Sequence, residues 1–496
     1  MTPAPHPGAP DLRHGTAAAR WVLAATVLGS GIAFLDGTVV NVALPSIGEE
    51  LDASIGGLQW TVNGYLVTLS ALLLLGGGLG DRYGRRRIFV VGLVWFTAAS
   101  LACGLAPGIE LLVVARALQG VGGALLVPSS LAIISATFHP DDRGRAIGAW
   151  SGLSGVASAV GPFLGGWLID SASWRWVFLV NVPLAAVAVA IALRHVPETR
   201  AGTPGEAGPL DLPGAALVTL GLAALTWAAI DQDGASSVAS ALLGVSALVG
   251  FVAVERASRA PMVPLEVFRI RQFTGANVTT FALYGGLGGA MFLVVLRLQV
   301  SLGYSALEAG AALVPFTVLM LLLSPAAGQL GSAVGPRLPM TVGPIVAGAG
   351  LALLAGIGDG DRYVPDVGAG VVVFGLGMSL TVAPLTAAVL AEVGERRVGV
   401  ASGINNAIAR LAGLFAVAGV PALAGIRSDS TLGEGLDDGY ATAMWICAGA
   451  CVVGGLVAAV AMRRGAGTVP AIHPAVDQAC NEAALARGAR RDPEGP

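Results

Sequence analysis

The sequence predicts an all-α polytopic membrane protein with about fourteen transmembrane helices, and its composition and the spacing of its apolar segments carry that prediction. Hydrophobic residues make up 55% of the 496 residues and charged residues only 12%, too little charge to cover the surface of a soluble protein. Apolar stretches of about 20 residues, long enough to cross ~30 Å of hydrocarbon as helix, recur from residue 21 to residue 462. These stretches lack the alternation of barrel strands, and backbone groups in lipid must bond internally, so the spans are helices.

The spans between the two halves of the chain are the hardest to assign. A twelve-span protein with a long cytoplasmic linker at 196–271 is the alternative, but segments 212–230 and 238–254 contain no charged residue, which favours their insertion. The expected spans are 21–45, 57–80, 88–106, 109–136, 145–169, 174–194, 212–231, 237–255, 273–299, 308–330, 340–357, 367–391, 399–425 and 440–462.

Arginine is the basic residue of this chain, which contains no lysine, and it is concentrated in the even-numbered connections between spans. The odd-numbered connections are acidic or neutral, as at 49–52 (EELD) and 359–361 (DGD). By the positive-inside rule, both termini are expected in the cytoplasm. Arginine usage with abundant Ala and Gly is typical of a GC-rich genome, so we expect a bacterial plasma (inner) membrane. The arginines concerned are Arg82, Arg85, Arg86, Arg87, Arg143, Arg145, Arg194, Arg200, Arg256, Arg259, Arg269, Arg271, Arg337, Arg396 and Arg397.

Two echoes between the halves indicate a duplicated six-helix bundle with two helices inserted at the middle. GGLGDRYGRR at 77–86 is matched by GQLGSAVGPR at 328–337, with Ser332 in the place of Asp81, and GVGGALLVP at 120–128 by GLGMSLTVAP at 375–384. The expected organisation is a disordered cytoplasmic tail at 1–20, an N-terminal six-helix bundle at 21–194, a two-helix insertion with cytoplasmic flanks at 195–271, a C-terminal six-helix bundle at 272–462 and a cytoplasmic tail at 463–496.

The composition argues against several other classes of protein. Without lysine there is no Walker A loop, and a net charge of −3 argues against a nucleic-acid partner. The four cysteines are too few for a disulfide framework. The five histidines fall in tails or loops, and no cysteine and histidine residues cluster. We therefore expect no metal, no cofactor and no enzymatic activity.

Two charged residues inside the expected spans are the candidates for chemistry. Asp36 lies about 24 Å of helix from Arg20, at 1.5 Å per residue, which is past the middle of the first span. Burial in hydrocarbon disfavours the charged form of a carboxylate, so Asp36 can take up and release protons. The alternative is a structural aspartate that pairs with Arg116 or is capped by Asn41. Arg116 needs a partner in Asp36, Gln119 or backbone carbonyls, and is either a proton-transfer and charge-balancing residue or an interfacial arginine.

Six motifs follow one another along the chain. They are LDGTVVNVALP (35–45), GGLGDRYGRRR (77–87), RALQGVGGALLVP (116–128), GPFLGGWL (161–168), WRWVFLVNVP (174–183) and LQVSLGYSALEAGAALVP (298–315). Together they resemble the major facilitator superfamily, in its fourteen-helix drug:proton antiporter branch, over residues 20–462. The chain departs from that pattern at Ala157, where the antiporter motif has glycine, and at Arg297, where the branch has an aromatic or apolar residue. The sequence leaves the roles of Arg297 and of Arg410, inside the thirteenth span, open.

The resemblance implies the major facilitator fold and proton-coupled antiport by alternating access. It implies that Asp36 is the protonation and cation-recognition site, with Arg116 as its proton-coupling partner. It also implies that the loop after the second span is a cytoplasmic latch, with Asp141 and Asp142 as plausible partners of its arginines. The latch residues are Gly77, Asp81, Gly84, Arg85 and Arg86. Hinge and packing residues, where glycine lets helices approach and Pro162 leaves a carbonyl free, are Gly120, Pro128, Gly161, Pro162 and Gly165.

The expected function is proton-coupled secondary efflux of lipophilic, often cationic drugs across the lipid bilayer, by a chain that works as a monomer. Its partners are protons and a small molecule, and the proton gradient replaces any cofactor. The alternatives are a dedicated exporter or importer of one metabolite or antibiotic on the same fold, and a non-transporting receptor or membrane enzyme, for which no catalytic constellation is present. Amide and aromatic side chains predicted to contact substrate are Asn41, Trp60, Asn63, Tyr65, Gln119, Asn277, Phe281, Tyr284, Asn405 and Asn406.

Overall fold

Fourteen helices long and apolar enough to cross a membrane are present in the described part of the chain, which confirms the predicted fold class. The computed structural model describes residues 12–200, 210–232, 234–258, 261–358, 363–391, 398–430 and 432–463. The two segments between the bundles are among the spans, so the twelve-span alternative is wrong. The expected tail after residue 463, the DGD turn at 359–361, and Arg259, Arg396 and Arg397 lie outside the described residues.

The first half forms six spans, the last of them made of two consecutive helices. Its helices are α1 (Ala17–Glu50), α2 (Ile55–Tyr83), α3 (Arg85–Gly104), α4 (Ile109–Thr137), α5 (Pro140–Ser171), α6 (Trp176–Leu179) and α7 (Asn181–His195). The inserted pair is α8 (Leu212–Ile230) and α9 (Gly234–Ala257).

The second half follows a short 3₁₀ segment, and its first span ends in a π-helical turn. Its elements are η1 (Leu265–Arg269), α10 (Arg271–Leu296), η2 (Arg297–Ser301), α11 (Ala306–Ala312), α12 (Val314–Val334), α13 (Arg337–Leu354), η3 (Tyr363–Val367), α14 (Gly368–Ala391), α15 (Val398–Leu423) and α16 (Leu432–Ala461).

Side-chain caps set where several helices begin. Thr16 and Ser54 each accept a hydrogen bond from a backbone N–H in the first turn of α1 and α2, which satisfies a donor that the start of a helix leaves free. Ser305 and Glu308 form a capping box at the start of α11. Local sequence therefore determines the residue at which each of these helices begins.

The prediction of a disordered tail at 1–20 is wrong for its described part, because residues 12–20 are ordered against the start of α5. Leu12 pairs with Phe138 in an isolated parallel β-bridge. Arg13 forms an ion pair with Asp141 at 3.4 Å, and α1 already begins at Ala17.

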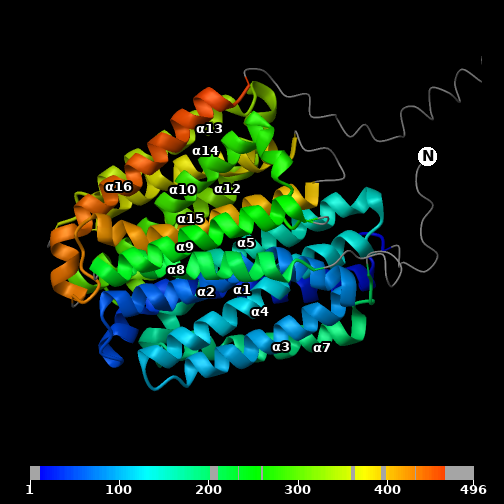
Figure 1. Ribbon diagram of the computed structural model, residues 1–496, viewed down its shortest axis with the longest axis horizontal. Coiled ribbons are helices and arrows are strands. Elements are labelled where there is room, and N and C mark those ends of the chain that lie inside the picture. Colours follow the sequence, from blue (N-terminus) through cyan, green and yellow to red (C-terminus); the bar gives the residue numbers. More distant parts are fainter. Residues whose placement is uncertain are drawn as a thin grey trace, which may run out of the picture.

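The same pattern of packed helices occurs twice. In the first half α1 packs against α5 and α7, and α4 against α2 and α3; in the second half α10 packs against α15 and α16, and α14 against α12 and α13. In Figure 1 the two groups lie side by side with their long helices running in nearly the same direction. α8 packs on α9 and also contacts α2 and α15, one helix from each half, so the inserted pair covers the seam between them.

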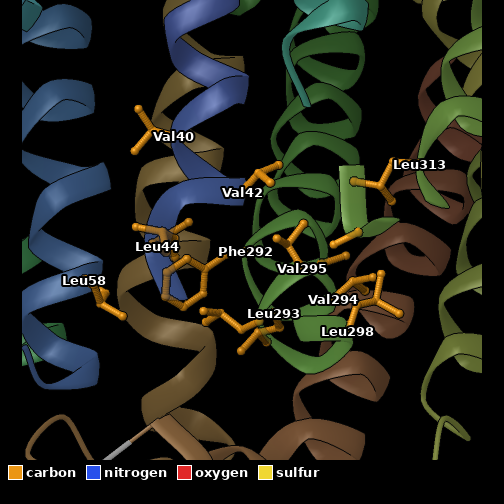
Figure 2. Packing of buried hydrophobic residues seen from close by; sticks show 14 of the residues in the cluster. Val40, Val42, Leu44, Leu58, Phe292, Leu293, Val294, Val295, Leu298 and Leu313 are labelled. Carbon is orange, nitrogen blue, oxygen red and sulfur yellow. The ribbon is translucent and has the colours of Figure 1, made fainter. Parts of the chain in front are cut away.

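The two halves are sealed together at one end of the bundle, opposite to the arginine-rich end that carries loop 81–87 and the start of α5. There the side chain of Gln59 on α2 donates to two carbonyls near the end of α15, at 2.7 and 3.2 Å. Asp170 on α5 accepts from two backbone N–H groups at the start of α11, at 3.2 and 3.0 Å. Figure 2 shows Leu44 of α1 beside Phe292 of α10, within a hydrophobic cluster drawn from both halves.

At the arginine-rich end, α5 is separated from the second half. Pro162 and Gly166 contact the backbone of α11 at Gly310 and Ala306. Because 3.6 residues make one turn, Gly155, two turns before Pro162, lies on the same face of α5. A Cβ added there, or at the glycines at 144, 148 and 152, would meet no atom within 4 Å. One face of α5 is thus sealed in its second part and open in its first.

Two adjacent glycines of α2 differ in how closely they are packed, which gives a matched pair for mutation. An alanine at Gly76 would overlap the backbone carbonyl of Ala124 on α4, whereas at Gly77 the nearest atom is Cβ of Pro128 at 3.7 Å, an ordinary contact. We expect Gly76→Ala to destabilise the protein by about 1–3 kcal/mol. Gly77→Ala should be neutral, or stabilising by up to about 1 kcal/mol, because alanine is the better helix former. Thermal unfolding of the two variants in one detergent measures the difference, and equal melting temperatures would contradict this packing.

Candidate functional site

A carboxylate and a guanidinium form an ion pair inside the first half. Asp36 Oδ2 lies 2.5 Å from Arg116 Nη1, and both side chains are fully buried. Asp36 Oδ1 accepts from Gln119 Nε2 at 2.8 Å and from Asn181 Nδ2 at 3.3 Å. Both carboxylate oxygens therefore have donors, which a buried charge requires. The pairing of Asp36 with Arg116, which the sequence left as one of several alternatives, is present.

Arg116 is held by two other helices, α2 and α6, besides the helix of Asp36, and by Gln119 of its own helix. Its Nε donates to the backbone carbonyl of Thr61 on α2 at 3.1 Å, and Nη1 also donates to Gln119 Oε1 at 2.5 Å. The guanidinium lies 4.4 Å from the ring centroid of Tyr65 on α2 and 5.7 Å from that of Phe178 on α6. Both rings stabilise the cation through their π faces.

A second layer of polar groups orients the pair, and the sequence did not predict it. Ser100 Oγ on α3 accepts from Gln119 Nε2 at 2.8 Å and from Asn181 Nδ2 at 3.3 Å, and Cys103 Sγ donates to Gln119 Oε1 at 3.7 Å. The network thus joins α1, α2, α3, α4, α6 and α7. The one available signal was Asn181, an amide inside the apolar run WRWVFLVNVP.

An open space between the halves borders this network. Gly37, adjacent to Asp36, is exposed, and a Cβ there would meet no atom within 4 Å. α1 is packed against α4, α5 and α7 of the first half and α10 and α11 of the second. An exposed position in the middle of α1 therefore faces the space between the halves. Asn41 lies one turn further on and is half-buried. Gly413, in the middle of α15, is also half-buried, but a Cβ there, as at Gly37, would meet no atom within 4 Å.

The residues predicted to contact substrate do not all border this space. Asn63, Tyr65, Gln119 and Asn277 are buried, so they do not border the open space in this conformation. The Tyr65 hydroxyl donates to the carbonyl of Ala33 at 3.2 Å, and Gln119 belongs to the ion-pair network. Both are structural contacts of the first half.

Of the remaining candidates, some pack against neighbouring helices and others border the space between the halves. Asn405 Nδ2 donates to Asn277 Oδ1 at 3.1 Å and to a threonine hydroxyl of α10 at 2.8 Å, which joins α15 to α10. Tyr284 is half-buried against an apolar cluster of the second half, and Trp60 packs on a tryptophan of α8. Phe281 is 44% exposed and its ring lies 6.4 Å from that of Phe415. Asn41 and Asn406 are the two half-buried amides on helix faces that border the space.

The predicted packing glycines stand where helices approach closely. A Cβ at Gly120 would overlap the backbone carbonyl of Tyr65 on α2. A Cβ at Gly161 or Gly165 would overlap the side chains of Thr38 and Val39 on α1. These three positions fix the distances between α4 and α2 and between α5 and α1, as small residues do between membrane helices.

Pro162 leaves the carbonyl of Ser158 without its helical donor, as predicted. Thr38 Oγ1 on α1 donates to that carbonyl at 2.9 Å, so the freed group is satisfied across the helix pair. Pro128 also lies inside its helix, α4, where its Cβ would lie 3.7 Å from a Cβ added at Gly77 of the predicted latch.

The latch loop is tied within its own half. Asp81 forms an ion pair with Arg85 at 2.9 Å, and Arg86 with Glu198 at 3.7 Å. The Glu198 carboxylate also accepts from two backbone N–H groups at the start of α3, both at 3.1 Å. Gly84 joins α2 to α3 at φ 111°, which glycine favours, and a Cβ there would come within 2.7 Å of Glu198. Among the described residues, these contacts of the loop stay in the first half.

The expectation that Asp141 or Asp142 pairs with Arg85 or Arg86 is wrong. Asp141 pairs with Arg13 at 3.4 Å, and Asp142 with another arginine of α5 at 3.6 Å. The partner that the sequence missed is Glu198, just after α7, which the distance of 112 residues along the chain hid from local reasoning.

A duplicated bundle of membrane helices, with a buried ion pair beside a space between its halves, defines a membrane transporter rather than an enzyme. The sequence profile of the Major Facilitator Superfamily matches residues 26–417. The chain belongs to this superfamily.

Curated relatives cover most of the chain. It is 36% identical over 411 residues to the "Probable actinorhodin transporter" of Streptomyces coelicolor. That alignment covers 79% of this chain and 70% of the relative. The chain is 36% identical over 391 residues to "Multidrug resistance protein Stp" of Mycobacterium tuberculosis (78% and 72%) and 32% identical over 431 residues to the "Tetracenomycin C resistance and export protein" of Streptomyces glaucescens (85% and 78%). The chain is thus an efflux transporter of the superfamily and not an enzyme, and its resemblance to the fourteen-helix drug-transporting branch is confirmed.

Solved structures show the same fold at low sequence identity. A crystal structure of the peptide transporter POT aligns with a TM-score of 0.67 at 14% identity, over 91% of this chain and 96% of that one. A bacterial homologue of the human lysosomal transporter Spinster, in an inward-facing and unoccupied conformation, aligns with a TM-score of 0.63 at 16% identity, over 90% and 97%.

Breaking the buried pair from one side should cost more than neutralising both partners. We expect Arg116→Gln to lower the free energy of unfolding by about 3–5 kcal/mol, because it leaves the Asp36 carboxylate buried without its counter-charge. The double variant Asp36→Asn/Arg116→Gln should recover at least half of that loss, since amides can keep the hydrogen bonds without a charge. Thermal unfolding of the single and double variants in one detergent measures the coupling. A double variant as unstable as the sum of the two singles would contradict a charge-based role.

Proposed function

We propose that the chain is a proton-coupled antiporter that exports lipophilic small molecules by alternating access. The observation that carries this proposal is the Asp36–Arg116 ion pair, fully buried in the first half and adjacent to the exposed Gly37 at the space between the halves. Protonation of Asp36 would remove its charge and release Arg116, so the proton changes the electrostatics of the helix that borders the space. That links proton uptake to the conformation of the bundle.

We propose that the arginine-rich end is cytoplasmic and that both termini lie on that side of a bacterial plasma membrane. The distribution of arginine supports this orientation. With it, the seal at Gln59 and Asp170 lies outside and the open first part of α5 lies inside, which is an inward-facing conformation. The first part of the α5 face then closes onto the second half in the outward-facing conformation, and the latch loop engages there.

A dedicated exporter of one antibiotic or metabolite is the second candidate function, and the names of two relatives support it. Two of the relatives are named for single compounds, actinorhodin and tetracenomycin C, and one for multidrug resistance. The breadth of compounds that dissipate a proton gradient separates the two functions.

Proton coupling is tested in inverted vesicles that carry the wild type or Asp36→Asn. After the vesicles are energised to an acidic interior, lipophilic compounds are added and the recovery of a pH-sensitive dye is followed. We expect several compounds to dissipate the gradient with the wild type and none with Asp36→Asn, because the amide cannot carry a proton. A response to one compound alone favours the dedicated exporter. No response from inserted wild type, or an unchanged response from Asp36→Asn, contradicts proton coupling through this residue.

The external seal is tested by the access of a membrane-impermeant maleimide to Gly37→Cys in intact cells. We expect slow labelling in the otherwise wild-type chain, and labelling about tenfold faster with Asp170→Ala, which removes charge-assisted hydrogen bonds to the start of α11. Glu308→Ala is the matched control, because that carboxylate caps the same helix from within its own half. The chain without the engineered cysteine sets the background. Fast labelling without Asp170→Ala, or an equal effect of Glu308→Ala, would contradict the seal.

A further inference from the structure

Arg410 is a basic residue in the middle of α15 whose partners are all neutral. Its Nε donates to Asn406 Oδ1 at 3.2 Å, and its guanidinium lies 5.6 Å from the ring centroid of Phe34 on α1, in the other half. In the described part of the chain no carboxylate forms an ion pair with it. Arg410 is half-buried, whereas Arg116, fully buried in the first half, has Asp36.

The face of α15 that carries Arg410 borders the space between the halves. Asn406, Arg410 and Gly413 follow one another at intervals of four and three residues, which places them on one side of a helix. A Cβ at Gly413 would meet no atom within 4 Å, and neither would one at Gly37, three residues after Phe34 on α1. Because Arg410 reaches a ring of the opposite half, this face is directed into the bundle.

The chemistry of the guanidinium defines what this site can bind. Of its five N–H groups, the one on Nε is used by Asn406, and the four on Nη1 and Nη2 have no acceptor among the described residues. A charge at membrane depth is costly and normally functional. Two parallel N–H donors match the oxygens of a carboxylate or sulfonate. The carboxylate of Asp36, by contrast, has both oxygens occupied by Arg116, Gln119 and Asn181, and is buried.

We propose that Arg410, with Asn406 beside it, is an anion-binding subsite of the substrate cavity, and that the chain exports lipophilic organic anions. The anionic group binds the terminal nitrogens of Arg410, and the apolar body lies along α1 at Phe34 and Gly37. This inference rests on the proposed efflux function and replaces the cationic class of substrate expected from the sequence.

The test compares two probes with the same ring and opposite charge, naphthalene-2-sulfonate and 2-naphthyltrimethylammonium. Their binding to the purified full-length chain in detergent is measured by equilibrium dialysis. We expect the wild type to bind the sulfonate at least tenfold more tightly than the ammonium. Arg410→Gln should weaken sulfonate binding roughly tenfold to a hundredfold and leave ammonium binding unchanged, the effect of losing a charge-assisted hydrogen-bond pair. Arg410→Lys should keep part of the preference for the sulfonate over the ammonium, because lysine keeps the positive charge but cannot form the bidentate hydrogen bonds of a guanidinium.

Two further variants serve as controls. Arg194→Gln removes the same charge from an exposed position at the end of α7 and should bind like the wild type. Gly413→Leu keeps Arg410 but fills the open space beside it, and leucine is a good helix former, so it should fold and lose sulfonate binding. If Arg410→Gln does not fold, Gly413→Leu and Arg410→Lys decide the question.

The outcomes separate this inference from the proposed function. Equal binding of both probes, tighter binding of the ammonium, no binding of the sulfonate at millimolar concentration, or an equal loss with Arg194→Gln overturns the anion subsite. Sulfonate binding that depends on Arg410, in a chain that shows no proton exchange in inverted vesicles, supports the subsite and contradicts the proposed coupling.

Discussion

The ion pair between Asp36 and Arg116 is the constraint on which the rest of the first half depends. Removing two charges from water costs several kcal/mol per ion, and their attraction offsets this only where every remaining donor and acceptor is satisfied. Six helices therefore converge on the pair: α1 and α4 supply the ions, α2 a carbonyl and a ring, α3 a hydroxyl, α6 a second ring and α7 an amide. A change in the protonation of one carboxylate acts on all of them at once.

Close helix contacts determine which helices are coupled to a change in the protonation of Asp36. The glycines at 120, 161 and 165 leave no room for a side chain, so α1 and α5, and α2 and α4, move as pairs. α5 is therefore tied to the helix of Asp36 over its second part and meets α11 across the seal, while its first part is open. Interfaces packed this tightly have discrete arrangements rather than a continuous range, which suits a two-state cycle.

Local composition was enough to predict the helices, their number and the residue that carries the buried charge. The spans follow from apolar length, and Asp36 stands out as a carboxylate deep in an apolar run. What could not be predicted depends on which side chains meet in space. Glu198 and Ser100 are ordinary polar residues of the sequence, and only the packing of α3 against α4 and α7 gives them their partners. The burial of Asn63, Tyr65, Gln119 and Asn277 could not be predicted for the same reason, since the sequence alone does not show which face of each helix packs against a neighbour.

The charge of the exported molecule decides how the membrane potential enters the cycle. Exchange of one proton for one monovalent cation moves no net charge, so only the pH gradient drives it. Exchange of one proton for one monovalent anion moves the equivalent of two positive charges inward, which at 100 mV is worth about 4.6 kcal/mol, or more than three orders of magnitude in concentration. Asp36 is buried and neutralised by Arg116, while Arg410, at the space between the halves, has only neutral partners, so this arrangement is electrostatically suited to the second case. If one proton is exchanged for each anion, such a transporter would draw most of its driving force from the potential rather than from the pH difference.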